Sequence, residues 1–203
     1  MMELFETMRL EEGQISRESY HYKRLKQASE ALGFKFDDMA WKHCIQNIQS
    51  TLTQGTHRIK VLLSKDGTLQ YVDAPLPKTQ MMSASLKKLD SSTPIWQRIY
   101  KTTERDYLNH SHITQLVLLY DVNEKILEFD IGNVVVEFEG QYITPKYEDD
   151  FLRGCMRQDL LDNQKIEVGI LTLSSLKQFL NQGGKLWMIN SLRGWVPVKL
   201  IEL

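Results

Sequence analysis

Hydrophobic residues in the first third of the chain recur at spacings typical of two helices and several short strands. Apolar positions three or four apart run from 17 to 32, with Ser16 as a candidate N-cap and Gly33 where a C-terminal cap belongs. A second helical pattern, capped at 37 or 38, runs to residue 48. Alternating or apolar runs predict strands at 4–10, 58–64 and 69–72.

Strand patterns dominate the rest of the chain. The run 115–120 is almost wholly apolar, which predicts a strand buried on both faces. Helices are expected at 155–162 and from Ser174 or Ser175 to Leu180. Further strands are expected at 81–86, 126–129, 133–138, 142–144 and 185–190, and from 196 onward.

A proline-containing stretch, 73–78, separates the two patterns. We therefore expect a small N-terminal α/β domain, 1–76, and a larger β-rich C-terminal domain, 77–203. The fold class that follows is α+β, with two subdomains.

Composition narrows the class of protein. Of the 203 residues, 42% are hydrophobic and 25% are charged, as in ordinary globular proteins. The formal net charge of -1 disfavours nucleic acid and anionic lipid as partners. No apolar run is long enough to span a bilayer, the N-terminus lacks a signal-peptide pattern, and two cysteines signal neither disulfides nor a thiolate metal site. We expect a cytoplasmic protein without a membrane partner.

Several common catalytic motifs are absent from the sequence. It contains no GxSxG, no GxxxxGK[ST] and no GxGxxG. The five histidines show no HExxH spacing, and His110 and His112 have no third ligand nearby, so no metal is expected.

The segment Lys101-Thr-Thr-Glu-Arg105 admits two interpretations. It is either a solvated polar loop, or it holds a lysine whose pKa is lowered by a neighbouring cation such as Arg105. A lysine of the second kind is nucleophilic and can form a Schiff base.

Other segments have equally open interpretations. Glu128 is either the exposed residue of a strand or a buried carboxylate that needs a cationic partner. The glycine turns in 152–157 and 190–194 are either plain turns or anion nests. Arg24, beside the apolar Leu25, has the geometry to grip a phosphate.

In this order and at these separations, the segments resemble the class IV aminotransferases, the fold-type-IV pyridoxal-phosphate enzymes. That group contains branched-chain aminotransferase, D-amino-acid aminotransferase and aminodeoxychorismate lyase. The resemblance covers nearly the whole chain. The matching segments are Phe5-Glu-Thr-Met-Arg9, His21-x-x-Arg24-Leu25, Ala31-Leu-Gly33, Lys101-Thr-Thr-x-Arg105, Leu127-Glu128 with Asn133, Ile143-Thr-Pro145, Leu152-x-Gly154-x-x-Arg157 and Asn190-Ser-x-Arg-Gly194-x-x-Pro197-Val198.

The resemblance implies a role for each matching position. Lys101 would be the Schiff-base lysine, Glu128 would pair with the pyridine nitrogen of pyridoxal 5'-phosphate, and Arg24 would grip its phosphate. The rest of the phosphate cup would come from the backbone of Cys155 and Met156, with Asn190 and Ser191. The site would lie between the two domains of a homodimer that acts on a small amino substrate. Tentative substrate residues are Thr7, Arg58, Arg105 and Tyr107.

Two reactions are compatible with this resemblance. The segments near 5, 101 and 190 look more like aminodeoxychorismate lyase, which eliminates pyruvate to leave 4-aminobenzoate, a folate precursor. The alternatives are an amino acid aminotransferase, or a catalytically silent member. Family members usually carry further strands ahead of the Phe-Glu-Thr segment, which puts the substrate pocket more in question than the cofactor site. Cys155-Met156 stands where Ile-Thr is more usual, so one hydroxyl contact to phosphate would be lost.

Overall fold

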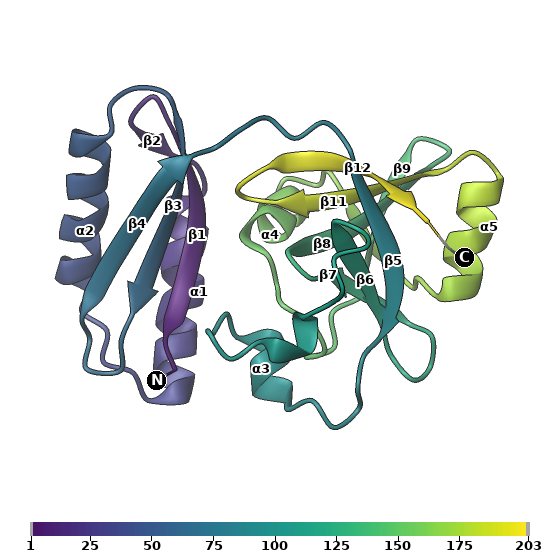
Figure 1. Cartoon of the computed structure of the whole chain (residues 1–203), viewed down its shortest axis with the longest axis horizontal. Helices are drawn as coiled ribbons and strands as arrows, with labels where there is room; N and C mark the ends of the chain where they lie inside the picture. The colour runs from purple at the N-terminus through teal and green to yellow at the C-terminus, as the bar shows by residue number, and fades with distance from the viewer. Residues whose placement is uncertain (1, 202–203) are drawn as a thin grey trace. The chain divides into compact units, whose positions relative to one another are not determined.

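The structure, a computed structural model, describes residues 2–201 and divides into two compact units (Figure 1). The first unit comprises residues up to Lys78 together with Tyr100–Glu104, and the second comprises Thr79–Ile99 and the residues from Arg105 on. We expected one boundary between 76 and 77, with Lys101 in the second part. The structure instead groups the short segment that carries Lys101 with the N-terminal strand.

Backbone hydrogen bonds explain why this segment belongs to the first unit. Phe5 N–H donates to the carbonyl oxygen of Lys101 at 3.0 Å, and Thr103 N–H donates to that of Glu3 at 2.9 Å. Leu4 and Thr102 form an antiparallel bridge. The segment therefore lies as an added edge along the first strand.

The first unit is a four-stranded sheet with two helices. The N-terminal pattern predicted both helices and three of the strands, but not the short β2. Its order is β2 (Gln14–Ile15), β1 (Leu4–Glu11), β3 (Thr56–Leu63) and β4 (Leu69–Pro75). The helices are α1 (Glu18–Leu32) and α2 (Asp38–Thr51). Alternate residues of β1 are buried, and with β3 and both helices they form one apolar cluster. Because burial alternates along β1, the side chains between the buried ones lie on the other face of the sheet, where polar residues can be placed.

The two helices of this unit begin differently. Asp37 caps α2, and its carboxylate accepts from the backbone N–H groups of Met39 and Ala40. Ser16 does not cap α1: the N-cap is Arg17, in a left-handed conformation without a side-chain cap bond. The prediction of Ser16 was wrong because the turn after β2 adds one residue before the helix.

The second unit contains an eight-stranded sheet that closes on itself. Its order is β10-β9-β8-β11-β12-β5-β6-β7, and β7 also pairs with β8, so the strands from β8 round to β7 form a closed ring. The strands are β5 (Met82–Lys88), β6 (Leu116–Tyr120), β7 (Ile126–Phe129), β8 (Gly132–Phe138), β9 (Gln141–Pro145), β10 (Glu167–Gly169), β11 (Lys185–Asn190) and β12 (Gly194–Leu200). Closure gives β6 and β7 buried residues on both faces, as the apolar run at 115–120 predicted.

Short helices complete this unit. They are α3 (Ile95–Ile99), the 3-10 turn η1 (Asp106–Leu108), α4 (Cys155–Asp162) and α5 (Leu173–Asn181). The pattern predicted α4 and α5 but neither of the other two. Thr172, not Ser174 or Ser175, is the N-cap of α5, and it forms a capping box with Ser175.

Two further features concern expectations about metal and membrane. His110 and His112 lie in a loop, with their ring centroids 4.3 Å apart and the rings tilted by 52° to each other. No helix among residues 2–201 is both long and apolar enough to cross a membrane.

Candidate functional site

Lys101 lies in the first unit, where β1 fixes its backbone. Its carbonyl oxygen accepts from Phe5 N–H, and its ammonium nitrogen lies over the Phe5 ring, 5.1 Å from the centroid. Lys60 approaches the same ring at 4.7 Å. Phe5 therefore holds two ammonium groups by cation–π attraction.

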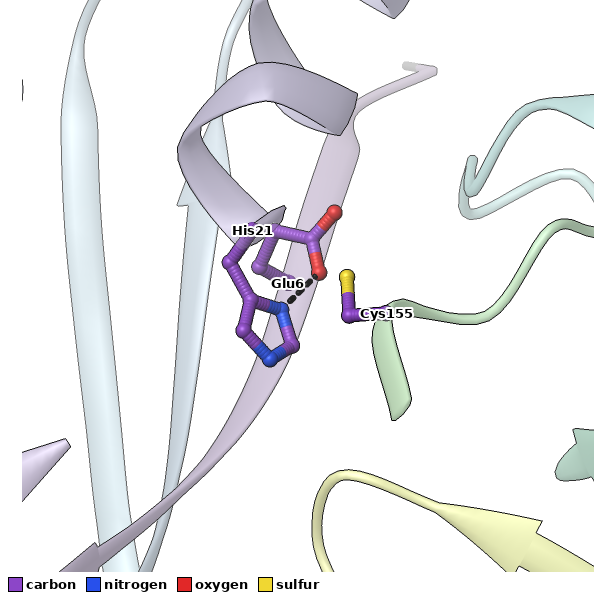
Figure 2. A group of neighbouring side chains, drawn as sticks. All are labelled: Glu6, His21 and Cys155. Carbon is purple, nitrogen blue, oxygen red and sulfur yellow. Dashed lines mark hydrogen bonds and ion pairs between the residues drawn. The ribbon is translucent and has the colours of Figure 1, made fainter. Parts of the chain in front are cut away.

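Glu6 is a buried carboxylate that binds two basic side chains of α1, and Figure 2 shows its contact with one of them, His21. His21 Nδ1 lies 2.7 Å from Glu6 Oε2, and Arg24 Nε donates to Oε1 at 2.8 Å. Arg24 Nη2 donates to Oε2 at 2.5 Å, which completes a bidentate grip. The side chains of Glu6 and Arg24 are 1% and 15% exposed. We call Phe5, Glu6, His21, Arg24 and Lys101 the lysine cluster.

Opposite charges keep Glu6 ionised although it is buried. Burial alone would raise its pKa, but the charges and hydrogen bonds of Arg24 and His21 hold the pKa of Glu6 well below its ordinary value. Burial lowers the pKa of His21, and the positive charges of Arg24 and Lys101 add to this against the attraction of Glu6. A neutral His21 then donates its Nδ1 proton to the carboxylate, while Arg24 keeps a fixed orientation.

The other face of the same strands carries the tentative substrate residues of the first unit. Thr7 pairs with Lys60, and Arg9 pairs with Arg58, between antiparallel β1 and β3. Cross-strand partners share a face, so Thr7, Arg58 and Lys60 lie on the face of Phe5 and not in the helix-covered core. This face is positively charged, which suits a carboxylate.

Glu128 is placed in the second unit, at the end of β7. It is 3% exposed, and its Oε1 lies 3.5 Å from Arg105 Nη2. Arg105 Nη2 also donates to the phenol oxygen of Tyr107 at 3.1 Å. Burial, and after it the negative charge of Glu128, raise the pKa of Tyr107 to about 12 against the opposing effect of Arg105. Arg105, Tyr107 and Glu128 form the glutamate cluster, in which a buried carboxylate has the cationic partner it requires.

Two backbone turns of the second unit can hold an anion. Helix α4 begins at Cys155, and its N-cap, Gly154, supplies no side-chain cap bond. Met156 packs its side chain with Val135 and Ile189, so its N–H and not its side chain is available at the helix start. The first N–H groups of such a helix attract negative charge.

The second turn follows β11. Asn190 Oδ1 accepts from the backbone N–H groups of Leu192 and Arg193, at 3.1 and 2.7 Å. Ser191 is 7% exposed, and its buried hydroxyl has no hydrogen-bond partner among residues 2–201. A buried hydroxyl without a partner is unfavourable unless a ligand satisfies it. The polar atoms of this turn and of the α4 start therefore fit a phosphate.

The sequence-predicted residues thus fall into separate groups. Within the first unit, Arg24 binds Glu6 on the helix-covered face of the sheet. Lys101 lies over Phe5, a residue on the same face as Thr7 and Arg58. The second unit holds the other predicted residues, Arg105, Tyr107, Glu128, Cys155, Met156, Asn190 and Ser191.

Sequence reasoning missed the role of Glu6. The signal was present, because Glu6 falls between Leu4 and Met8 on the inward phase of an alternating strand. A carboxylate on a core-facing position needs a cationic partner. His21 and Arg24, three residues apart on a predicted helix, were the candidates.

Solved structures share this fold. An amino-acid aminotransferase by provisional assignment, from Mesorhizobium loti, is 27% identical with a TM-score of 0.86, and the match covers 99% of this chain and all of that one. A provisionally assigned 4-amino-4-deoxychorismate lyase from Haemophilus somnus is 20% identical with a TM-score of 0.73, covering 96% and 98%. A hypothetical aminotransferase from Mycobacterium tuberculosis in its PLP-bound form is 18% identical with a TM-score of 0.81, covering 98% and 81%.

The two units have an α+β fold. The first unit carries Lys101, and the second carries the Asn190–Ser191 turn, whose polar atoms fit a phosphate. The family model for class IV amino-transferases matches residues 3–201, and the chain belongs to that family of pyridoxal-phosphate enzymes. The resemblance and the fold class expected from the sequence are therefore confirmed. No curated protein matches the chain significantly.

Proposed function

We propose that this chain binds pyridoxal 5'-phosphate through Lys101 and acts on an anionic amino substrate. The observation that carries the proposal is the lysine cluster. Lys101 is tied to β1 and lies over Phe5, in the unit where Glu6 fixes the phosphate-binding candidate Arg24. Pyridoxal phosphate, when bound, supplies an aldehyde and an electron-withdrawing ring that stabilises negative charge at a substrate carbon.

The chain's own residues would then have distinct tasks. Lys101 would hold the cofactor through its amine and would carry the proton of the substrate Cα. Glu128, paired with Arg105, would bind the ring nitrogen and favour its protonated form. Arg24, the backbone N–H groups of Cys155 and Met156, and the Asn190–Ser191 turn bind the phosphate.

The charge of the open sheet face supports a substrate that carries a carboxylate. Arg58 and Lys60 flank Thr7 on this face. In the second unit, Arg105 and Tyr107 supply a cation and a phenol. We propose an aminodeoxychorismate lyase-like elimination of pyruvate that leaves 4-aminobenzoate. Amino acid transamination is the second candidate, because the structures with this fold include a provisionally assigned amino-acid aminotransferase.

Cofactor binding is tested with purified protein and added pyridoxal phosphate. We expect visible absorbance from the bound cofactor, and borohydride should fix it to the peptide that carries Lys101. Lys101→Ala should abolish this labelling. Lys60→Ala is the matched control, since Lys60 lies over the same Phe5 ring and should leave labelling intact. Protein that stays colourless, or that is labelled at Lys60, would contradict the proposal.

The product separates the two reactions. Cofactor-loaded protein should release pyruvate from aminodeoxychorismate without any second substrate. A transaminase forms more than one equivalent of keto acid per site from an L- or D-amino acid only when a keto-acid acceptor is present. No product in either assay, from protein that binds the cofactor, would identify a silent member.

A further inference from the structure

Asn133 connects β7, which carries Glu128, to the start of α4. The proposed function gives these two elements different tasks. Asn133 stands at the start of β8, directly paired with Glu128 of β7 and with Ile189 of β11. Its side chain is not turned to solvent, since the residue is 3% exposed. Asn133 Nδ2 donates to the carbonyl oxygen of Leu152 at 2.8 Å, and Oδ1 accepts from Gly154 N–H at 3.0 Å. Both amide atoms therefore hold the segment just ahead of α4.

The side chain of Asn133 leaves no room for a Cβ atom at position 154. A Cβ at position 154 would lie 2.1 Å from Asn133 Oδ1. The φ angle of Gly154 is -68°, which any residue can adopt, so the glycine is required by this approach and not by its backbone conformation.

This link replaces an ordinary helix cap. Gly154 has no side chain to cap α4, so Asn133 fixes the N-cap residue from a neighbouring strand. Arg157, in the first turn, ties the helix to β9: Nε donates to Thr144 Oγ1 at 3.2 Å and Nη2 to the carbonyl oxygen of Pro145 at 2.8 Å. The direction of the Cys155 and Met156 N–H groups therefore depends on side chains outside the helix.

We propose that Asn133 is a positioning residue for the cofactor phosphate, acting through the start of α4. This rests on the proposed function, in which the N–H groups of Cys155 and Met156 bind that phosphate. Asn133 orients them by holding Leu152 and Gly154, and does not itself contact the phosphate. Backbone donors that are held in place bind an anion without a further ordering cost.

The test compares the affinities of the apoprotein for pyridoxal phosphate and for pyridoxal, which lacks the phosphate. In Asn133→Ala the ratio of the two affinities should fall about tenfold, because charge-assisted bonds to phosphate are weakened while ring contacts remain. Amide hydrogen exchange of the apoprotein should accelerate at 153–158. Asn163→Ala is the matched control: its side-chain amide bonds to the Asp159 carbonyl oxygen at the far end of α4 and should leave the ratio unchanged.

Asn133→Asp keeps the test decisive if the alanine variant does not fold. It preserves the acceptor for Gly154 N–H but loses the donor to Leu152, and should lower the ratio by about threefold. An unchanged ratio in a folded Asn133 variant would overturn the positioning role while leaving the proposed function intact. Wild-type protein that binds neither compound would instead defeat the proposed function. Equal losses for both compounds would show a general structural role and also overturn the proposal.

Discussion

At the scale of single residues, the buried carboxylates show what could be read from the sequence. Glu6 interrupts an inward-facing series of apolar residues, so alternation could have indicated a buried carboxylate in need of a cationic partner, although this was missed. The structure supplies the partners, Arg24 and His21. Glu128 carried no such signal, because β7 is buried on both faces and lacks alternation. The role proposed for Glu128 rests on the family resemblance. Its pairing with Arg105 required the structure.

Tyr107 yields a prediction at this scale. Its pKa is raised from 10.0 to about 12, because burial and Glu128 disfavour the phenolate. At about pH 11, where an ordinary tyrosine is mostly ionised, most of Tyr107 should remain a phenol. The difference in tyrosinate absorbance between wild type and Tyr107→Phe measures this, with circular dichroism to show that both stay folded. If this absorbance difference titrated fully near pH 10, the pKa of Tyr107 would not be raised, and the burial of its phenol would be contradicted.

At the scale of elements, most helices and strands were predicted where spacing is regular. Both long helices and the main strands lie where their patterns placed them. The caps of α1 and α5 were wrong, because a cap depends on where the backbone leaves its helical conformation and not on which Ser or Thr is nearby. Helix α3 and the turn η1 are too short to show a period.

The capping box of α5 gives a stability prediction. Thr172 Oγ1 accepts from Ser175 N–H at 3.1 Å, and Ser175 Oγ lies 2.9 Å from Thr172 N. Thr172→Ala should destabilise the second unit by about 1 kcal/mol. Urea unfolding measures the change, with Ser174→Ala as a control that leaves both bonds in place. Cofactor affinity should not change, and equal losses from the two variants would argue against the capping box.

The register of β1 and β3 predicts how the substrate is bound. Arg58 presents its positive charge on the face that carries Thr7 and Lys60. Arg58→Met should raise KM for a carboxylate-bearing substrate about tenfold, through loss of a charge-assisted bond, with a smaller effect on kcat. Arg58→Lys retains the charge and should recover part of the loss. Steady-state kinetics that show a fall in kcat alone would place Arg58 outside the binding face.

At the scale of the whole molecule, the first unit is discontinuous in sequence. The segment Tyr100–Glu104 joins residues before 79, although its neighbours on both sides belong to the second unit. No periodicity in a five-residue stretch could show this, because it depends on edge hydrogen bonds to β1. The same long-range pairing brings Lys101 to the unit that holds Arg24.

The first unit should lose stability as the pH falls, because two members of the lysine cluster have lowered pKa values. The pKa values of His21 and Glu6 are both lowered from ordinary values of 6.5 and 4.5. The unfolded chain therefore binds more protons than the folded one, first at His21 below about pH 6.5 and then at Glu6 below about pH 4.5. Each such proton makes the free energy of unfolding fall by up to about 1.4 kcal/mol per pH unit.

Trp41 makes the measurement specific to the first unit. It is the only tryptophan of that unit and lies buried in its core, so its fluorescence reports urea unfolding there once Trp96, Trp187 and Trp195 are replaced by Phe. In this background, His21→Asn should flatten the dependence between pH 6.5 and 4.5. Glu6→Gln should lower stability at neutral pH, because Arg24 loses its buried partner, and should remove the steeper fall below pH 4.5. If both variants kept the wild-type slope, the protons would be taken up elsewhere and the cluster would not control the stability of this unit.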